Sequence, residues 1–439
     1  MAFLPRALAF LAALAVLASG ATVPASAAAP PYTLAWLLAD GQCPFPLPIV
    51  TAEGPVELFL ALQPALRAQG SPRGEMIRLN PSPEERWRFT EGAGPVSYGA
   101  AALAQTQNGP VVIFGAEDGA IRALGATTGS LLWKCQLASP VRSSVAVADI
   151  NADGAQEAVI ASTDGSVYAL SLAGQVLWRA ALGGPISCSP ALMDVDGEGI
   201  QEVFLGCDDG FVYCVSGRDG AVRWRFLTGW AVTGAPLVGD LERKGRYLVL
   251  VGSDDGYLYC LDAVAGHMLW RWRTGAPVTG ACAVADVAGD QALEVLFGSD
   301  NLYCLSSQGM LLWTHEDGRR FVTSPVVADL EGFGRASVIA GSDDLLCLDA
   351  STGEERWEWT FRDESLFDPL LVDLGNDGTL EVIVSSTDGY LWCFTPLPGT
   401  PRQVPLWIRS RANTQNTGNI PDGLAYAASR GLAVLPWQR

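Results

Sequence analysis

Residues 248–270 read LVLVGSDDGYLYCLDAVAGHMLW, and VIVSSTDGYLW at 382–392 repeats part of the phrase. Eight times along the chain a tryptophan closes such a phrase, with 43 to 50 residues from one tryptophan to the next. These residues are Trp87, Trp133, Trp178, Trp224, Trp270, Trp313, Trp357 and Trp407. A repeat of this length with several short strands per unit is typical of a propeller blade. The sequence therefore predicts an all-β protein with a β-propeller fold.

The unit that ends at Trp224 shows how one blade is expected to form. Asp209-Gly210 predicts a tight hairpin turn, because glycine readily takes the positive φ that such turns require. Strands are expected on both sides of this turn and at the two ends of the unit, at 185–194, 202–206, 211–215 and 221–226. Four antiparallel strands per unit make up a propeller blade.

Four segments are expected along the chain: a signal peptide at 1–27, a lead-in at 28–48, the propeller at 49–410 and a tail at 411–439. The first unit matches the repeat least well. Its second half fits at 75–87, and 33–40 fits an inner strand of the same unit. We favour eight four-stranded blades, and seven blades with a decorated N-terminus is the alternative.

The N-terminus indicates export. Arg6 precedes an apolar run from Ala7 to Leu17, and an A-x-A pattern at 25–27 favours cleavage after Ala27. The run is too short to span a bilayer, and no later stretch looks transmembrane. We therefore expect a protein that is secreted, periplasmic or on the cell surface.

The charge balance excludes some partners. The formal net charge is −19 at pH 7, and nucleic acids and anionic lipids both require a positive surface. We expect no nucleic-acid partner, and we expect a monomer. A protein or a surface glycan fits a broad acidic disc better, and the charge favours cations in a general way.

Five of the ten cysteines occupy the same place in successive repeats, where Ala123 and Ala169 stand in earlier units. They are Cys214, Cys260, Cys304, Cys347 and Cys393. Equivalent places on neighbouring blades diverge beyond disulfide reach, and alanine in the same place indicates a small buried slot. We expect buried thiols, with Cys43 and Cys135 outside the pattern. Each closing tryptophan is expected to pack between blades over the glycine of the turn preceding it, such as Gly129, Gly220, Gly266 or Gly353.

The turns after the inner strands carry the candidate metal ligands. Calcium takes about six to eight oxygen ligands, and alternating acids in a glycine-containing loop supply them. The two full candidate sets are Asp149, Asn151, Asp153 and Glu157, and Asp194, Asp196, Glu198 and Glu202. Partial sets begin at Asp286 and Asp373, and the loops that begin at Asp240 and Asp329 have decayed to LERKG and LEGFG after the aspartate. The alternative is that the first aspartate only caps its own turn.

The phrases LGATTGSLLW (124–133), LDAVAGHMLW (261–270) and LDASTGEERW (348–357) resemble the tryptophan-docking repeat of PQQ-dehydrogenase-like propellers. The turns DINADGAQE (149–157) and DVDGEGIQE (194–202) are similar to the FG-GAP loops of integrin-type propellers. The first resemblance implies a quinoprotein oxidoreductase, or a degenerate relative of one, as an alternative function.

Catalysis finds little support in the sequence. Quinoproteins commonly have a vicinal cysteine pair, which this chain lacks, and it also lacks a C-x-x-C-H motif. His267 and His315 lie in or beside blade turns without a nucleophile motif nearby, so we read both as structural. We expect no PQQ, and calcium stays a candidate. The favoured function is an exported, non-catalytic binding or scaffold module for a protein, a glycan or another ligand.

Overall fold

A computed structural model describes residues 32–39, 47–49, 57–62, 75–90, 99–361, 366–387, 389–401 and 403–407. The described residues form β-strands, turns and loops, without a helix. None of them forms a helix long and apolar enough to cross a membrane. The expected signal peptide, the tail at 411–439 and Cys43 lie outside these ranges.

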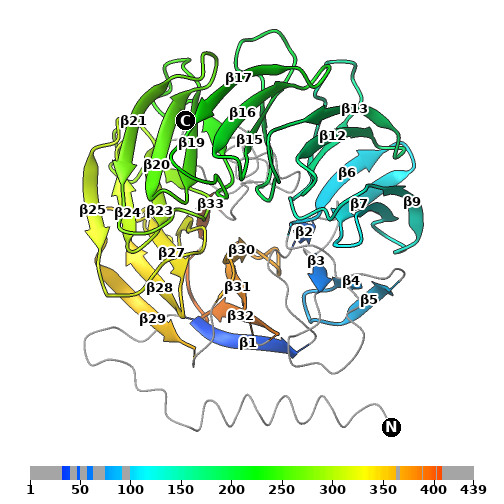
Figure 1. Cartoon of the computed structure of the whole chain (residues 1–439). Helices are drawn as coiled ribbons and strands as arrows, with labels where there is room; N and C mark the ends of the chain where they lie inside the picture. The colour runs from blue at the N-terminus through cyan, green and yellow to red at the C-terminus, as the bar shows by residue number, and fades with distance from the viewer. Residues whose placement is uncertain are drawn as a thin grey trace.

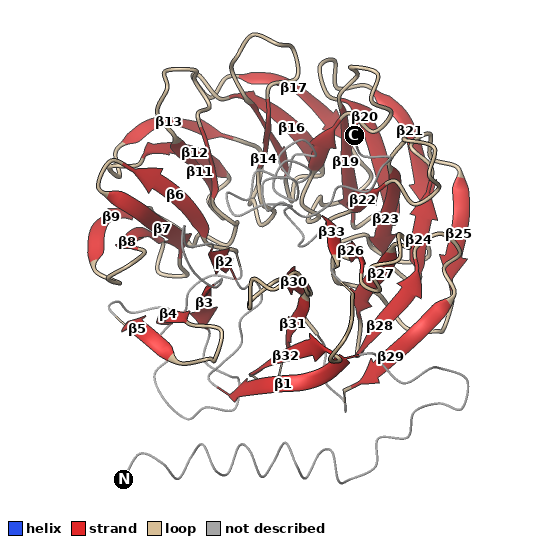
Figure 2. Ribbon diagram, turned by 180° about the vertical axis from the view of Figure 1, so that it is seen from behind, coloured by secondary structure: helices blue, strands red, loops and turns tan. Residues whose placement is uncertain are grey.

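Eight sheets are arranged as the blades of a ring around a central channel (Figures 1 and 2). This confirms the predicted all-β propeller and its eight blades. Each blade has four antiparallel strands, the inner one at the channel and the outer one at the rim. A fifth strand, β33 (Val404–Trp407), pairs with the inner strand of blade 7.

The first four blades follow the chain in order. Blades 1 and 2 contain β2 (Leu47–Ile49), β3 (Glu57–Leu62), β4 (Glu75–Leu79), β5 (Glu85–Phe89), β6 (Ala102–Thr106), β7 (Gly109–Gly115), β8 (Ala120–Gly125) and β9 (Leu131–Gln136). Blades 3 and 4 contain β10 (Ala146–Ala148), β11 (Glu157–Ala161), β12 (Ser166–Ser171), β13 (Val176–Ala181), β14 (Ala191–Met193), β15 (Glu202–Gly206), β16 (Phe211–Ser216) and β17 (Val222–Leu227).

The last four blades complete the ring. Blades 5 and 6 contain β18 (Leu237–Gly239), β19 (Leu248–Ser253), β20 (Tyr257–Asp262), β21 (Met268–Arg273), β22 (Ala283–Ala285), β23 (Glu294–Gly298), β24 (Leu302–Leu305) and β25 (Leu311–His315). Blade 7 contains β26 (Val326–Asp329), β27 (Ser337–Gly341), β28 (Asp344–Asp349) and β29 (Glu355–Thr360). Blade 8 contains β30 (Leu370–Val372), β31 (Glu381–Ser385), β32 (Tyr390–Pro396) and β1 (Tyr32–Ala39).

The core lies between neighbouring blades. Every residue of the second strand β15 is buried, because both faces of that strand are covered by adjacent sheets. The outer strand β17 alternates between exposed and half-buried residues, since only one of its faces meets a neighbour. Apolar residues therefore run without interruption along the second strands and alternate along the outer ones.

Each docking tryptophan contacts the next blade. The Trp178 indole packs on Gly220, where an added Cβ would lie 2.8 Å from the ring, and its Nε1 donates to Gly217 O at 2.7 Å. Trp87, Trp133, Trp224, Trp270 and Trp313 meet Gly129, Gly174, Gly266, Gly309 and Gly353 in the same way. The contact between blades was expected, but the glycine belongs to the following unit. The local sequence does not indicate which of the two neighbouring blades a side chain on an outer strand contacts.

Blade 8 is closed by the N-terminal strand. β1 pairs with β32, and Trp36 stands opposite Cys393, as Trp224 stands opposite Cys214 in blade 4. The register shift before Trp36 is also the one seen in blade 4. Two predictions made from the sequence are wrong here. Residues 33–39, expected within an inner strand of the first blade, belong to β1 at the outer edge of blade 8, and the eighth tryptophan position belongs to Trp36.

Trp407 instead ends β33 and stands opposite Val327 of β26. The five repeat-equivalent cysteines are buried free thiols, as expected, and Cys135 is half-buried and free. In blades 4 to 7, each of these cysteines faces the closing tryptophan of its own blade across the third and fourth strands.

Candidate functional site

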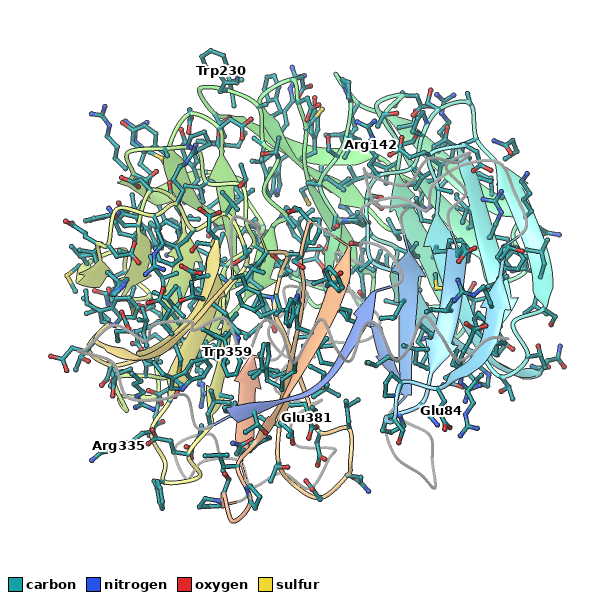
Figure 3. All side chains as sticks on the ribbon, turned by 90° about the horizontal axis from the view of Figure 1, so that it is seen from below. Glu84, Arg142, Trp230, Arg335, Trp359 and Glu381 are labelled. Carbon is teal, nitrogen blue, oxygen red and sulfur yellow. The ribbon has the colours of Figure 1, made fainter. Side chains whose placement is uncertain are left out.

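The strand directions give the ring two different faces. The loops that enter each inner strand and the turns between second and third strands lie on one face, which we call the channel face. The turns after the inner strands, which carry the candidate metal ligands, lie on the opposite face, which we call the acidic-loop face. Figure 3 shows Arg142 and Trp230 toward the channel face and Arg335 and Glu381 toward the acidic-loop face.

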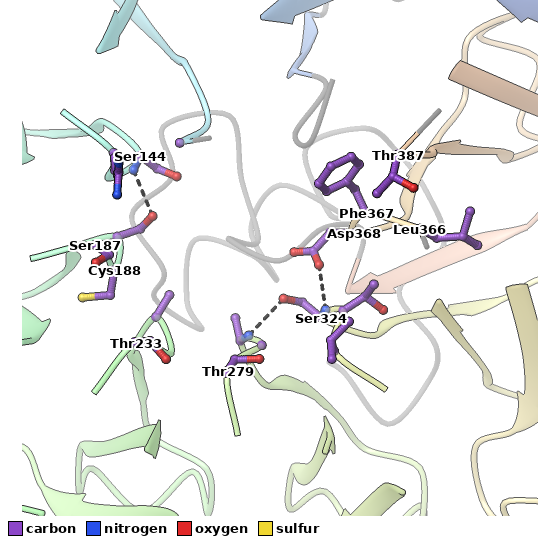
Figure 4. A pocket seen from close by; sticks show the side chains of 18 residues that line it. Ser144, Ser187, Cys188, Thr233, Thr279, Ser324, Leu366, Phe367, Asp368 and Thr387 are labelled. Atoms are coloured by element: carbon purple, nitrogen blue, oxygen red, sulfur yellow. Dashed lines mark hydrogen bonds between the residues drawn. The ribbon is translucent and has the colours of Figure 1, made fainter. Parts of the chain in front are cut away.

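A cavity of about 430 Å³ opens at the mouth of the channel (Figure 4). Seven blades, from blade 2 to blade 8, contribute residues to its lining. Eight of the eighteen lining residues carry a hydroxyl group: Ser144, Ser187, Ser189, Thr233, Thr279, Thr323, Ser324 and Thr387. Arg142, Asp368 and Phe367 are the charged and aromatic residues that accompany them.

Hydrogen bonds between blades connect the inner strands around this mouth. Ala100 N donates to Ser144 Oγ at 2.9 Å, and Ser144 N donates to Ser189 Oγ at 3.0 Å. On the other side, Ser324 N donates to Asp368 Oδ1 at 2.8 Å. Such bonds hold each inner strand to the next one, so the lining is preorganised rather than loose.

The charges at the mouth are unevenly compensated. Arg142 pairs with Glu117 at 2.9 Å. Within the described residues, the carboxylates of Asp208 and Asp254 accept hydrogen bonds from hydroxyl groups alone, from Ser187 at 3.4 Å and from Thr233 at 2.7 Å. Partial burial raises the pKa of Asp208, and the nearby charges of Asp254 and Asp209 raise it further. The mouth therefore favours positively charged groups.

The described lining contains no nucleophile–base pair of the kind that hydrolases use. His267 is exposed beside a blade turn, and His315 lies on an outer strand with Nδ1 3.2 Å from Gly353 O. Neither histidine lines this cavity.

The second acidic loop brings three predicted ligands together. Among the described residues, Asp194, Asp196 and Glu202 form the one group of three whose ligand atoms lie within 4.8 Å of one another. Glu202 is 3% exposed, and its buried Oε1 has no hydrogen-bond partner in the described part of the chain, although Arg223 lies 4.0 Å away. Burial raises the pKa of Glu202, and the charges of Asp196 and Asp194 also raise it. Glu198 is exposed and does not join the group.

The first acidic loop satisfies its acids internally. Asp149 accepts bonds from Asp153 N and Gly154 N, and Glu157 accepts one from Ile150 N. Asn151 Nδ2 donates to Asp153 Oδ2 at 3.0 Å. Burial raises the pKa of Glu157 to about 7, and Asp153 and Asp149 add to this effect. This geometry resembles a capped turn more than an open site for an ion.

The first aspartate of all six loops caps its turn. Asp240 and Asp329, whose loops lack acids at the fifth and ninth positions, accept backbone amide bonds just as Asp194 does. This aspartate therefore has a structural role whether or not an ion binds. The loops differ at their ninth position. Where this residue is a glutamate, its carboxylate accepts a hydrogen bond from the backbone amide of the second loop residue.

Sequence reasoning did not identify the channel mouth. It placed the inner strands near the axis but did not separate residues such as Arg142, Phe367 and Asp368 from their neighbours. The sequence does contain one signal for it. At one repeat position, successive units carry residues of different chemical character, namely Arg142, Ser187, Thr233, Thr279 and Val322. A core position would keep one chemical character, whereas this one does not.

Comparisons with known proteins agree with the repeat. A family model described as outer membrane protein assembly factor BamB matches residues 208–293 and 299–430, and a model of the lambda-carrageenase β-propeller domain matches 111–188. No curated protein sequence matches the chain. None of these matches tests the likeness of 149–157 and 194–202 to FG-GAP loops, which stays a prediction.

Solved structures show the same fold at low identity. The crystal structure of BamB from Moraxella catarrhalis is 17% identical, covers 83% of this chain and 99% of its own, and has a TM-score of 0.58. The computationally designed Ika8 protein is 16% identical, covers 81% of this chain and 100% of its own, and has a TM-score of 0.55. At such identities the likeness concerns the fold alone.

Proposed function

The chain is a PQQ-like β-propeller, and from this premise we propose that it is an exported, non-catalytic scaffold that binds a partner protein. The observation that carries the proposal is the channel mouth. Its lining comes from seven blades, is held by hydrogen bonds between blades, and offers hydroxyl groups without a nucleophile–base pair among its described residues. Two of these lining residues, Ser187 and Thr233, donate to the carboxylates of Asp208 and Asp254. A rigid surface of this kind suits binding.

A protein partner fits better than the other expected ligands. The matching family is described as an outer membrane protein assembly factor, which favours a protein and a location in the cell envelope. The apolar run at 7–17 supports export. A glycan would gain from several aromatic platforms at the mouth, where Phe367 is the aromatic residue of the described lining.

The quinoprotein alternative receives little support from the residues at the mouth. PQQ carries three carboxylates and needs cationic partners. Arg142 is already paired with Glu117, and Asp208, Asp254 and Asp368 would repel the cofactor. The chain's own residues therefore do not fit this group.

The test is site-specific photo-crosslinking in cells. A photoreactive amino acid replaces exposed Thr279 at the mouth or, as a control, exposed Ala155 on the acidic-loop face. We expect a discrete protein adduct from position 279 and none of the same mass from position 155. Absence of an adduct from both positions, or the same adducts from both, would contradict a partner at the channel face.

We also propose that the second acidic loop binds calcium and stiffens its turn. The convergence of Asp194, Asp196 and Glu202 and the unpartnered Glu202 oxygen support this proposal. Calorimetric titration of the metal-stripped protein is expected to give one site, which Asp196→Asn abolishes and Asp153→Asn preserves. Heat that is equal for both variants, or absent from the parent, argues for turn caps alone.

A further inference from the structure

We infer that blades 4 and 5 carry a docking site for a basic segment of the partner protein. A lysine or arginine side chain enters the mouth between Asp208 and Asp254, and an apolar neighbour covers Trp230 and Leu227. This inference rests on the proposed scaffold function and specifies the surface and the chemistry of its partner.

The first observation is the pair of carboxylates. Asp208 and Asp254 occupy equivalent places on the turns β15–β16 and β19–β20 of adjacent blades. Within the described part of the chain neither forms an ion pair, whereas Glu117 at the same place in blade 2 pairs with Arg142. Two unpaired carboxylates that repel each other favour a cation from outside the chain.

The second observation is an exposed tryptophan that the fold does not require. Trp230 is 71% exposed, and its carbonyl accepts a bond from Ser253 Oγ. Carbonyls that accept the matching bond in other blades belong to Ser139, Gly184 and Ala276. Small residues hold this position in these three blades, and in blade 7 it holds Arg319, which forms ion pairs. Packing between blades therefore does not explain the indole, and a large exposed aromatic is typical of a binding surface.

Leu227 departs from the repeat beside it. It is 59% exposed, and it lies three residues after the docking tryptophan of blade 4. The same place in other blades holds Gln136, Ala181, Arg273, Glu316 and Thr360. Two large apolar side chains thus break the pattern within four residues of sequence.

The loop that carries Trp230 contacts both acidic turns. Ala231 O accepts a bond from Asp254 N at 2.9 Å, and Gly229 N donates to Asp255 Oδ2 at 2.7 Å. The Trp230 carbonyl lies 3.1 Å from the place of a Cβ on Gly210, which follows Asp208 and Asp209. The apolar pair and the acidic pair therefore belong to one continuous patch.

Charge complementarity selects the occupant. The chain carries a net charge of −19, and this patch contains two carboxylates that form no ion pair with the described residues. A lysine or arginine satisfies them, and both side chains also interact well with an indole face. An acidic segment or a purely apolar helix would leave the two carboxylates unpaired or buried.

Fluorescence anisotropy with synthetic peptides tests the inference on the mature protein. The probe is a short labelled peptide of Lys-Leu-Ser repeats, with a Glu-Leu-Ser peptide as its counterpart. We expect saturable binding of the lysine peptide, weaker at high salt, and none of the glutamate peptide. The variant Asp208→Asn with Asp254→Asn is expected to lower the affinity about tenfold, and Trp230→Ser by a similar factor.

A matched control removes two charges elsewhere. Glu354→Gln with Glu355→Gln alters two exposed residues at the β28–β29 turn, on the opposite face. Equal losses in both double variants would reduce the effect to net charge and overturn the inference. If spermine displaces the lysine peptide completely and Trp230→Ser does not change the peptide's affinity, the site binds polyamines and a protein segment is not its occupant.

The two proposals fail separately. A crosslinked partner at position 279 without lysine-peptide binding leaves the scaffold function standing and removes this site. Because Trp230 and both aspartates are exposed or half-exposed, the variants are expected to keep the parent's thermal midpoint, which reports that the ring is intact.

Discussion

The contact between Trp178 and Gly220 defines the joint between two blades. Gly220 has φ +76°, and an added Cβ would lie 2.8 Å from the indole. Gly220→Ala is therefore expected to lower the free energy of unfolding by about 3 kcal/mol, measured by urea denaturation. Gly245→Ala is the control, because Gly245 has φ +77° and nothing within 4 Å of a Cβ, so only the backbone cost of about 1 kcal/mol remains. Equal losses would show that docking does not demand the glycine.

A buried carboxyl gives the stability a pH dependence. Burial raises the pKa of Glu381 from 4.5 to about 7, and Asp373 and Asp377 add to this effect. Between these values the folded state holds a proton that the unfolded chain has lost, so stability falls as pH rises and then levels off. Glu381→Gln is expected to reduce this fall in thermal midpoint, to which buried Glu157 also contributes, while exposed Glu354→Gln leaves it unchanged. A slope that Glu381→Gln does not alter would contradict the assignment.

Among the strands, the one that closes the ring could not be predicted from the sequence. Units 2 to 7 could be predicted because their four strands are consecutive and repeat a local phrase. The fourth strand of blade 8 comes from the other end of the chain, and Trp36 pairs with Cys393. No local pattern states such a pairing. The acidic loops show the same limit, because their spacing is alike while only Asp194, Asp196 and Glu202 converge.

Gln403 joins the elements that close the ring. It is fully buried; its Nε2 donates to Leu330 O and Tyr32 Oη, and its Oε1 accepts from Leu380 N. Gln403→Ala leaves these groups unpaired, and we expect a loss of about 2–4 kcal/mol in urea unfolding. Tyr32→Phe removes one of the bonds and is expected to cost about 1 kcal/mol. A smaller loss for Gln403→Ala than for Tyr32→Phe would contradict this role.

The channel mouth exists only in the complete ring. Its lining residues come from seven blades, and each blade offers only one to four of them. The repeat predicted the number of blades, but the position of a side chain around the axis depends on how far every blade turns. The proposed site at Asp208, Asp254 and Trp230 likewise depends on the assembled ring, because the turns that carry the two aspartates belong to different repeats.

Ring closure by β1 makes a prediction about the whole molecule. Without β1, the β32 strand becomes an open edge, and the hydrogen bonds of one edge are lost. Removal of residues 1–40 is expected to lower the thermal midpoint and to produce oligomers in light scattering, whereas removal of 1–27 leaves a monomer. A synthetic peptide of residues 32–40 should restore the monomer by supplying the missing strand in trans. A monomeric 41–439 chain with an unchanged midpoint would show that the other seven blades hold the ring without this strand.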